Sequence, residues 1–227
     1  MISDKYKCVF VHIPKAAGQS VEHYFLKSHN LSWVERAALL LKYNPDPNRG
    51  PERLAHLTAR EYIEYDYIEK NKFSSYFKFS FVRNPWDRIV SEYNYRDYYK
   101  NMTFSEFITK GLPHKSKYSD DYRHLIPQYD FLYDDKGKLL VDYVGRFEKL
   151  QDDFDHVCAQ LGFSDTQLPH TNSSKIESSL TSRDLLTKTK NNKKHKLYTD
   201  YYDDVTRKLV EIMYLKDIEA FGYKFGE

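Results

Sequence analysis

A short loop near the beginning of the sequence carries residue types that could bind an anion. The stretch VFVHIPKAAGQSVEHYF, residues 9–25, ends an apolar run at Pro14 and Lys15 and becomes amphipathic after Gly18. A strand followed by such a turn and a helix presents backbone N–H groups at the positive end of the helix dipole. Gly18 permits unusual dihedral angles, Lys15 adds a mobile charge, and Ser20 adds a hydroxyl donor. The pattern predicts an anion site, with an ordinary strand-to-helix turn as the alternative for one motif alone.

The loop differs from the nucleoside-triphosphate pattern G-x-x-x-x-G-K-[ST]. When Gly18-Gln19-Ser20 is aligned on the end of that pattern, Ile13 stands at the first glycine and Gln19 at the lysine. A magnesium-dependent triphosphate site keeps its lysine beside the Ser or Thr that binds the metal. Because the lysine lies earlier here, at Lys15, the loop is typical of a site for a smaller and less charged terminal group.

A second strand–turn–helix of the same design lies in YFKFSFVRNPWDRIVSEYNYR, residues 76–96. Arg83 ends the predicted strand, at the edge where ligands bind in open α/β sheets, and Ser91 follows within the next helix. Arginine presents a planar fork that matches phosphate, and a serine hydroxyl completes such a site. The alternative is an Arg83–Asp87 ion pair beside a solvated Ser91. Two anion-competent corners in one sheet favour the phosphate site.

His56 is one of nine histidines, and a histidine side chain can act as a proton acceptor. It lies in RLAHLTAREY, just before a capping box of Thr58 and Glu61, and a histidine has a pKa suited to general-base catalysis near neutral pH. The alternative is a histidine that only caps or packs at a loop–helix junction. His12, on the first predicted strand, is assigned a structural role. The nine histidines are scattered and the two cysteines are not at ligand spacing, so no metal site is predicted.

Composition limits the class of protein. The 227 residues suffice for a single α/β domain, residues 1–227, with a buried core. The formal net charge of +2 argues against a protein that coats nucleic acid, so any basic site must be local. Cys8 and Cys158 lie in apolar runs and are predicted to be buried thiols. The start of the chain lacks a signal-like segment and no apolar stretch approaches about 18 residues, so we expect a soluble cytoplasmic protein.

Strands that alternate with helices predict the fold class. We expect a P-loop-like, three-layer α/β domain with a central parallel sheet flanked by helices. The last helix is predicted to begin at Thr199, with Val205, Leu209, Ile212 and Met213 facing inward. The predicted strands are residues 6–12, 76–82 and 141–147, and the predicted helices are residues 20–27 and 33–42, segments that begin after Thr58, Asn84 and Thr103, and residues 150–161, which Gly162 closes.

Taken together, HIPKAAGQS and FSFVRNPWDRIVSEY resemble the two cofactor motifs of sulfotransferases that use 3′-phosphoadenylyl sulfate (PAPS). The closer likeness is to the carbohydrate branch that includes heparan 2-O-sulfotransferases. VDYVGRFEKLQDDF and YLKDIEAFGYKF are also similar to segments of that family, so the likeness spans most of the chain. The family often has threonine where Ala16 stands, so one side-chain contact is expected to be missing.

The resemblance implies roles for individual residues. Arg83 and Ser91 would bind the 3′-phosphate, and His56 stands where the family has its proposed general base. His170, Asn172, Ser173 and Lys175 begin a segment that resembles a cofactor-covering loop, from which Ser173 and Lys175 are candidate cofactor contacts. The loop that would grip the 5′-phosphosulfate consists of Lys15, Ala16, Ala17, Gly18, Gln19 and Ser20.

The expected reaction is in-line transfer of a sulfonate from PAPS to a carbohydrate hydroxyl, which leaves 3′,5′-adenosine bisphosphate. A terminal sulfonate carries one negative charge fewer than a phosphate, so Lys15 can stabilise the leaving oxygen and positioning does most of the rest. A P-loop-like small-molecule phosphotransferase and a non-catalytic glycan-binding protein of the same fold are the alternatives.

Two further features bear on the acceptor. The tyrosine-rich segments 43–53, 93–99 and 118–133 could stack on sugar rings, or could simply line an α/β cleft. The basic run 188–196 is a solvated loop, a gate over the cofactor, or a dock for an anionic glycan.

Overall fold

The computed structural model describes residues 1–169 and 196–227. Its sheet has the strand order β1-β2-β3-β4. Strands β2, β3 and β4 are parallel, and β1 pairs antiparallel with β2 at one edge, so the predicted parallel sheet gains an antiparallel edge strand. The strands are β1 (Ile2–Ser3), β2 (Cys8–Val11), β3 (Phe77–Val82) and β4 (Tyr143–Arg146).

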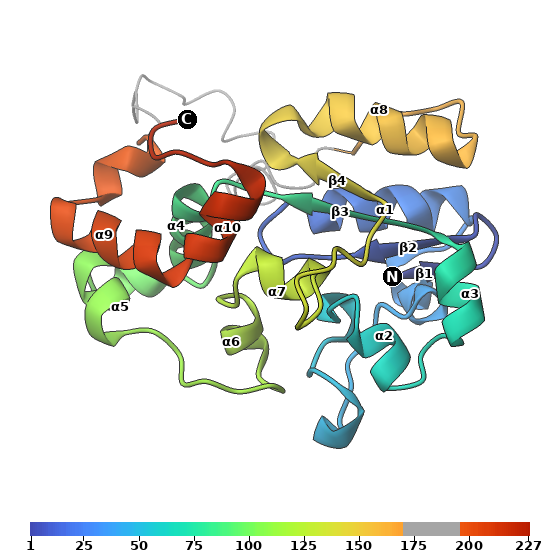
Figure 1. The fold of residues 1–227 in the computed structure, drawn as a ribbon, viewed down its shortest axis with the longest axis horizontal. Coiled ribbons are helices and arrows are strands. Elements are labelled where there is room, and N and C mark those ends of the chain that lie inside the picture. Colours follow the sequence, from blue (N-terminus) through green and yellow to red (C-terminus); the bar gives the residue numbers. More distant parts are fainter. Residues whose placement is uncertain (170–195) are drawn as a thin grey trace, which may run out of the picture.

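Helices cover the sheet and gather at one end of it (Figure 1). The α-helices are α1 (Gly18–Ser28), α2 (Glu61–Glu64), α3 (Lys70–Ser75), α4 (Pro85–Tyr95), α5 (Phe104–Lys110), α6 (Asp120–Arg123), α7 (Gln128–Leu132), α8 (Leu150–Leu161), α9 (Asp204–Met213) and α10 (Leu215–Phe221). The 3-10 helices are η1 (Trp33–Leu39), η2 (Pro47–Arg49), η3 (Leu54–His56), η4 (Tyr98–Lys100), η5 (Phe147–Lys149) and η7 (Tyr198–Tyr201). No helix in the described residues has the length and apolar composition needed to cross a membrane.

Both faces of the sheet are buried. Phe10 of β2 belongs to a core that includes Phe25 of α1 and Phe154 of α8. Val11, the next residue, points to the opposite face of the sheet and belongs to a second core that contains Tyr62 of α2. In Figure 1, α8 lies along one side of the sheet and α2 and α3 lie on the other. The sheet is therefore flanked by helices on each face, as a parallel sheet requires.

Local sequence signals for helix ends are confirmed at several places. The side chain of Asn84 accepts a hydrogen bond from the N–H of Trp86, with Pro85 at the first position of α4. Thr103 and Glu106 form a capping box at α5. Gly162 ends α8 with a φ of 72°. Short-range capping bonds are decided by neighbours in sequence, so these signals were readable without the fold.

The other local expectations have mixed outcomes. Thr58 and Glu61 form the two reciprocal bonds of a capping box before α2. The helix expected at residues 33–42 is a 3-10 helix that ends at Leu39. Cys8 and Cys158 are both buried and free, as predicted.

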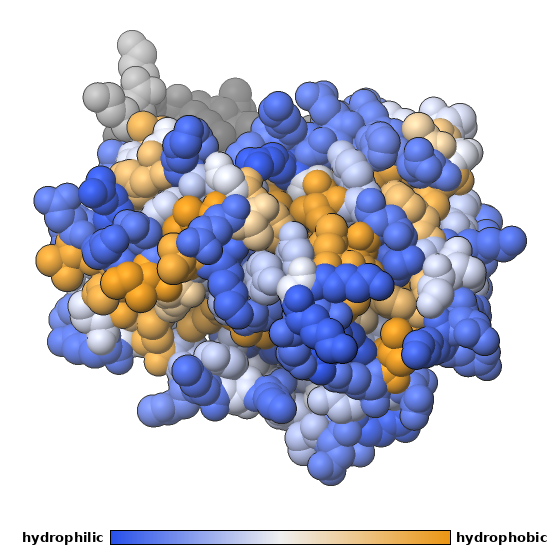
Figure 2. All heavy atoms as spheres, viewed as in Figure 1, coloured by the Kyte–Doolittle hydropathy of each residue, from blue (hydrophilic) through white to orange (hydrophobic). Residues whose placement is uncertain are grey.

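The inward face predicted for the last helix is wrong at three of its four positions, since only Met213 packs against the core. The helix α9 begins at Asp204, and Val205, Leu209 and Ile212 are exposed, whereas Thr206 and Val210 are buried. Thr206 tolerates burial because its hydroxyl donates to a carboxylate oxygen of Asp203 at 2.8 Å, which satisfies the polar group. The helix is thus rotated by one residue from the expected face, and apolar side chains appear on the surface over α9 in Figure 2.

Arg88 of α4 joins two loops that surround the ends of the strands. Its side chain is fully buried, and Nε donates to the carbonyl oxygen of Pro14 at 3.0 Å. Nη1 and Nη2 donate to the carbonyl oxygens of Ile126 and His124 at 3.0 and 2.8 Å. One guanidinium therefore holds the loop after β2 against the segment that links α6 to α7.

Replacement of this guanidinium is expected to destabilise the fold strongly. Arg88→Met should lower the free energy of unfolding by about 3–5 kcal/mol, because it leaves three buried carbonyl groups without donors. The matched control is Arg60→Met, since Arg60 forms only surface ion pairs, and it should cost about 1 kcal/mol or less. Urea-induced unfolding measures both, and equal losses would contradict the role of Arg88.

Candidate functional site

The loop between β2 and α1 has an unusual backbone for its sequence. Lys15 and Ala17 both have left-handed φ values, 67° and 69°, although neither is glycine. Such a conformation costs roughly 1–2 kcal/mol per residue, and strain of this kind gathers at functional sites. The observed loop is tight, since the N–H of Ala16 donates back to the carbonyl oxygen of Ile13.

The strained loop leads directly into α1, whose first backbone N–H groups are potential donors. Within the described residues, the N–H groups of Ala17, Gly18 and Gln19 donate to no acceptor. The first turn of α1 also contains no acidic side chain. Unpaired donors at the positive end of a helix form an anion site, so the chemistry of this corner fits the anion predicted from the sequence.

Gly18 serves a different purpose from the one expected. Its backbone is helical, and the left-handed residues are its neighbours. A Cβ atom on Gly18 would lie 1.8 Å from Nε2 of His12. The glycine is therefore required by close approach of the His12 imidazole, which is buried and bonded through Nδ1 to Glu22 of α1 at 2.6 Å.

The two predicted anion corners touch each other. Arg83 donates from Nη1 to the carbonyl oxygen of Lys15 at 3.1 Å. Its Nε donates to Asp87 at 2.8 Å, so the ion pair considered as the alternative is present as well. The guanidinium also lies 4.1 Å from the centre of the Phe147 ring. These three contacts hold Arg83 beside the first loop.

One face of α4 points toward Lys15. Asp87, Ser91 and Tyr95 are spaced four residues apart and share that face. The ammonium group of Lys15 lies 3.6 Å from the centre of the Tyr95 ring, a cation–π contact. Ser91 is half-buried, one helical turn before Tyr95. Lys15, Arg83 and Ser91 are therefore brought to one region.

His56 is held as a neutral imidazole. It ends η3, is only 6% exposed, and lies with Nδ1 2.8 Å from a carboxylate oxygen of Asp120. Burial lowers the pKa of His56 to about 3. With Nδ1–H donating to the carboxylate, the lone pair is on Nε2, which is the arrangement of an oriented general base.

Positive groups keep Asp120 ionised. Burial by itself raises the pKa of this carboxyl, but the hydrogen bond from His56 and the charges of neighbouring groups, including Arg53, hold it well below its usual value. Arg96 donates to the second carboxylate oxygen at 3.0 Å, and Nε of Arg53 lies 3.4 Å from the same atom. The Arg53 side chain is 62% exposed, so a charged group reaches solvent beside the histidine.

Two more imidazoles flank His56. The His12 ring is 4.9 Å away and the His124 ring 5.0 Å away, both edge to face. Each has its own buried carboxylate at 2.6 Å, Glu22 for His12 and Glu92 for His124. Three buried carboxylate–imidazole pairs therefore lie in a row. Burial lowers the pKa of His124, despite the opposing effect of Glu92.

The lysine and the histidine belong to one ring of contacts. Tyr95, which contacts Lys15, stacks on His124 with ring centres 5.9 Å apart. The chain of contacts runs through Lys15, Tyr95, His124, His56, His12 and Gly18 and returns to Lys15 along the loop. The structure therefore places the Lys15 ammonium group, the loop between β2 and α1, and the His56 imidazole around one centre.

Comparison with known proteins decides the family. A profile described as the sulfotransferase family matches residues 1–224. The chain belongs to the sulfotransferase family. An uncharacterized protein of Archaeoglobus fulgidus is 29% identical over 98 residues, which cover 42% of this chain and 75% of that protein. No solved structure matches this sulfotransferase, and its likeness to the heparan 2-O branch stays a prediction.

The histidine cluster of this sulfotransferase also has the residue types of a metal site. Among the described residues, His56, Asp120 and His124 place one potential ligand atom each within 4.8 Å of one another. Their hydrogen bonds already use Nδ1 of His56 and Nδ1 of His124, and the Arg96 guanidinium lies on the Asp120 carboxylate. A fixed positive charge at that carboxylate disfavours a metal cation, so the donor set fits a hydrogen-bonded base better.

The sequence predictions cover only part of this site. The candidate cofactor-covering residues and residues 188–195 of the basic run lie outside the described residues; the former are His170, Asn172, Ser173 and Lys175. Sequence reasoning missed Tyr95 and the pair Asp120–His124. Tyr95 is four residues after Ser91, and Asp120 four before His124, so helical spacing was a usable signal. It does not say which side of the fold a helix faces.

The contact between Gly18 and His12 can be tested by a double-mutant cycle. An ordinary Gly→Ala change at a helical position stabilises by about 0.4–1 kcal/mol. Gly18→Ala should instead destabilise by about 1–3 kcal/mol, since the new methyl group overlaps the imidazole. In a His12→Ala background this loss should nearly vanish. Thermal unfolding of the four proteins measures the coupling, and an equal cost in both backgrounds would refute the clash.

Proposed function

We propose that this sulfotransferase is a single-domain, P-loop-like enzyme that transfers a sulfonate from PAPS to a hydroxyl group of a carbohydrate. The observation that carries the proposal is the hydrogen bond from Arg83 to the carbonyl oxygen of Lys15 at 3.1 Å. The bond supports the proposal because the loop suited to the 5′-phosphosulfate then lies beside the arginine suited to the 3′-phosphate, so that one donor molecule could contact both. Family membership supports sulfonate transfer as the reaction.

The residues of the loop fit an anionic donor. The unpaired N–H groups of Ala17, Gly18 and Gln19, together with the charge of Lys15, would hold the 5′-phosphosulfate. Arg83 and Ser91 would hold the 3′-phosphate by charge-assisted hydrogen bonds. When bound, PAPS supplies an activated sulfonate, and 3′,5′-adenosine bisphosphate is the other product.

Side chains of this protein would accept the proton of the acceptor hydroxyl and stabilise the charges that develop during transfer. His56 receives the proton of the acceptor hydroxyl at Nε2, while Nδ1–H stays bonded to Asp120. The ionised Asp120 stabilises the imidazolium that forms and fixes the ring orientation. Lys15 neutralises charge that develops at the leaving oxygen. Asp120 is therefore a positioning residue, and His56 and Lys15 are the proposed catalytic residues.

Binding of the desulfonated product tests the donor site. We expect 3′,5′-adenosine bisphosphate to bind without magnesium, and Arg83→Ala to weaken it by about 10- to 100-fold, because a charge-assisted bond to phosphate is lost. Isothermal titration calorimetry measures this, with Arg60→Ala as the surface control. Binding of ATP with magnesium in place of the bisphosphate would favour the phosphotransferase and overturn the proposal.

Activity and its pH dependence test the base. His56→Gln should lower kcat for sulfonate transfer to desulfated glycosaminoglycans by about 10²- to 10⁴-fold, and bisphosphate affinity should not change. Asp120→Asn should lower kcat by on the order of 10²-fold, whereas the control Asp121→Asn, at an exposed neighbour, should not.

The pKa of His56 predicts how kcat/KM depends on pH. Burial lowers the pKa of His56 to about 3, so the imidazole is already neutral in the free enzyme at pH 5 to 8. The ratio kcat/KM should therefore show no acidic limb near pH 6.5, the ordinary value for histidine. A limb at that pH which disappears in His56→Gln would show that the base is not held neutral by burial.

A further inference from the structure

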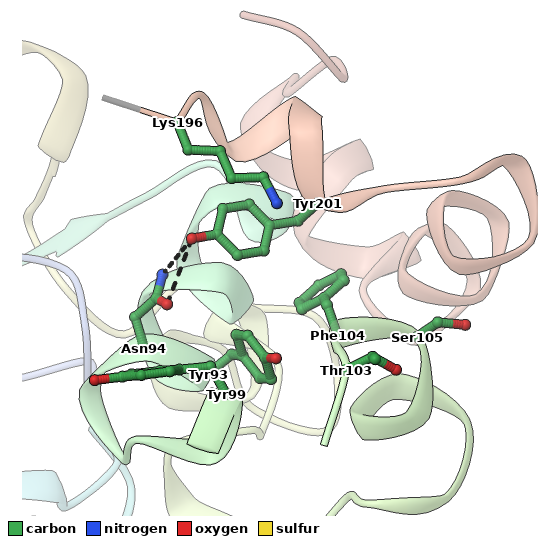
Figure 3. A pocket seen from close by; sticks show the side chains of 8 residues that line it. All are labelled: Tyr93, Asn94, Tyr99, Thr103, Phe104, Ser105, Lys196 and Tyr201. Atoms are coloured by element: carbon green, nitrogen blue, oxygen red, sulfur yellow. Dashed lines mark hydrogen bonds between the residues drawn. The ribbon is translucent and has the colours of Figure 1, made fainter. Parts of the chain in front are cut away.

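A hollow outside the ring of contacts lies where α4, η4, α5 and η7 meet (Figure 3). Its volume is about 530 Å³, within the range of pockets that hold small ligands. In Figure 3 the Tyr201 ring lies opposite the rings of Tyr93 and Tyr99, and Phe104 points between them. The lining residues are Tyr93, Asn94, Tyr99, Thr103, Phe104, Ser105, Lys196 and Tyr201.

The walls of the hollow combine aromatic faces with polar groups. Tyr93 is buried and its hydroxyl donates to the carbonyl oxygen of Met102, so it forms the floor with Phe104. Tyr99, by contrast, is 52% exposed. Asn94 and the hydroxyl of Tyr201 lie 3.3 Å apart at one rim. The exposed ring of Tyr99, bordered by amide and hydroxyl groups, suits a ligand with both C–H and O–H faces, which is the chemistry of a sugar ring.

A positive charge stands over this hollow. The ammonium group of Lys196 lies 4.0 Å from the centre of the Tyr201 ring. Across residues 1–169 and 196–227, the ion pairs formed do not include Lys196. Lys100, near the Tyr99 ring, is already paired with Asp97. Lys196 is therefore the lysine of this hollow whose charge suits a carboxylate or sulfate on the ligand.

The hollow is joined to the proposed reaction centre by one short segment. Tyr95 lies under Lys15, Arg96 donates to Asp120, and Tyr99 lines the hollow. A ligand in the hollow thus lies beside the site, and separate from the residues assigned to the donor and the base. A chain of several units could occupy both places at once.

We propose that this hollow binds an acidic sugar unit of the acceptor, at a distance from the hydroxyl that reacts. The proposal rests on the proposed function and makes the acceptor an anionic polysaccharide instead of a small alcohol. A peptide fits less well, because extended peptides commonly pair with an open strand edge and none of β1–β4 lines the hollow.

The test is calorimetric titration with octasaccharides of hyaluronan and of heparin, the neutral maltooctaose, and an octaglutamate peptide. At least one acidic octasaccharide should bind, at least about 10-fold more tightly than maltooctaose or the peptide. Tyr99→Ala and Lys196→Ala should each weaken it by about 10-fold, and added salt should also weaken it. Tyr99→Phe, which keeps the ring, should change the affinity by less than about twofold.

The matched control is Lys216→Ala, since Lys216 also lies over a tyrosine ring, that of Tyr129, but on α10. It should bind as the wild type does. Retained melting temperature and retained binding of 3′,5′-adenosine bisphosphate show that the variants are folded. The proposal is overturned if neither acidic octasaccharide binds, if Tyr99→Ala and Lys196→Ala bind like the wild type, or if maltooctaose or octaglutamate binds equally well.

The same titrations separate this inference from the proposed function. In one outcome, the protein binds the bisphosphate, and Tyr99→Ala and Lys196→Ala bind the glycan as the wild type does. That outcome refutes the proposed sugar site and supports the proposed donor site. In the other outcome, glycan binding requires Tyr99 and Lys196, but the bisphosphate does not bind. That outcome refutes the proposed donor site and supports a glycan-binding protein that uses this hollow.

Discussion

The buried guanidinium of Arg88 is the contact on which the arrangement of the site depends. An arginine removed from water is stable only if its donors are satisfied, and here the acceptors are carbonyl groups of Pro14, His124 and Ile126. Pro14 directly precedes Lys15, and His124 packs on His56. The Arg88 side chain therefore sets the distance between the loop that contains Lys15 and the imidazole of His56. It does so without needing to contact the proposed donor or acceptor.

The row of imidazoles shows how the interior accommodates several ionisable groups. Each ring has one carboxylate as its own partner, so the burial cost of each charge is offset by a short, direct bond. The rings meet edge to face and do not share a carboxylate as their principal partner. The arrangement keeps His56 neutral by desolvation while Asp120 stays ionised beside Arg96. A histidine in open solvent would lack both the lowered pKa and the fixed carboxylate partner.

Much of the fold was readable from the sequence because its signals are local. Strands β2 and β3, the caps at Asn84 and Thr103, and the glycine that ends α8 are determined by near neighbours. Arg83 was expected at the carboxyl edge of the sheet, where ligands bind in open α/β sheets, and its contact with Lys15 there was not predicted.

The long-range features were not readable in this way. Asp120 reaches His56 across 64 positions of the chain, and no local pattern indicates that pairing. The inward face of α9 depends on a capping bond that lets Thr206 be buried, which hydrophobic periodicity does not record. The role of Gly18 was misjudged for the same reason, since its requirement comes from the side chain of His12.

The helix α4 has consequences for how this protein can change over evolution. Asp87 is bonded to Arg83 and Tyr95 contacts Lys15, while Arg88 and Glu92 are buried and bonded. Asn94 reaches the hollow. Nearly every turn is therefore constrained by a different neighbour, and neutral drift along α4 should be slow. The hollow also receives Tyr99 from η4 and Tyr201 from η7, and Tyr99 is exposed. New preferences for acceptors would then arise more readily by substitution at exposed positions such as Tyr99 than within α4.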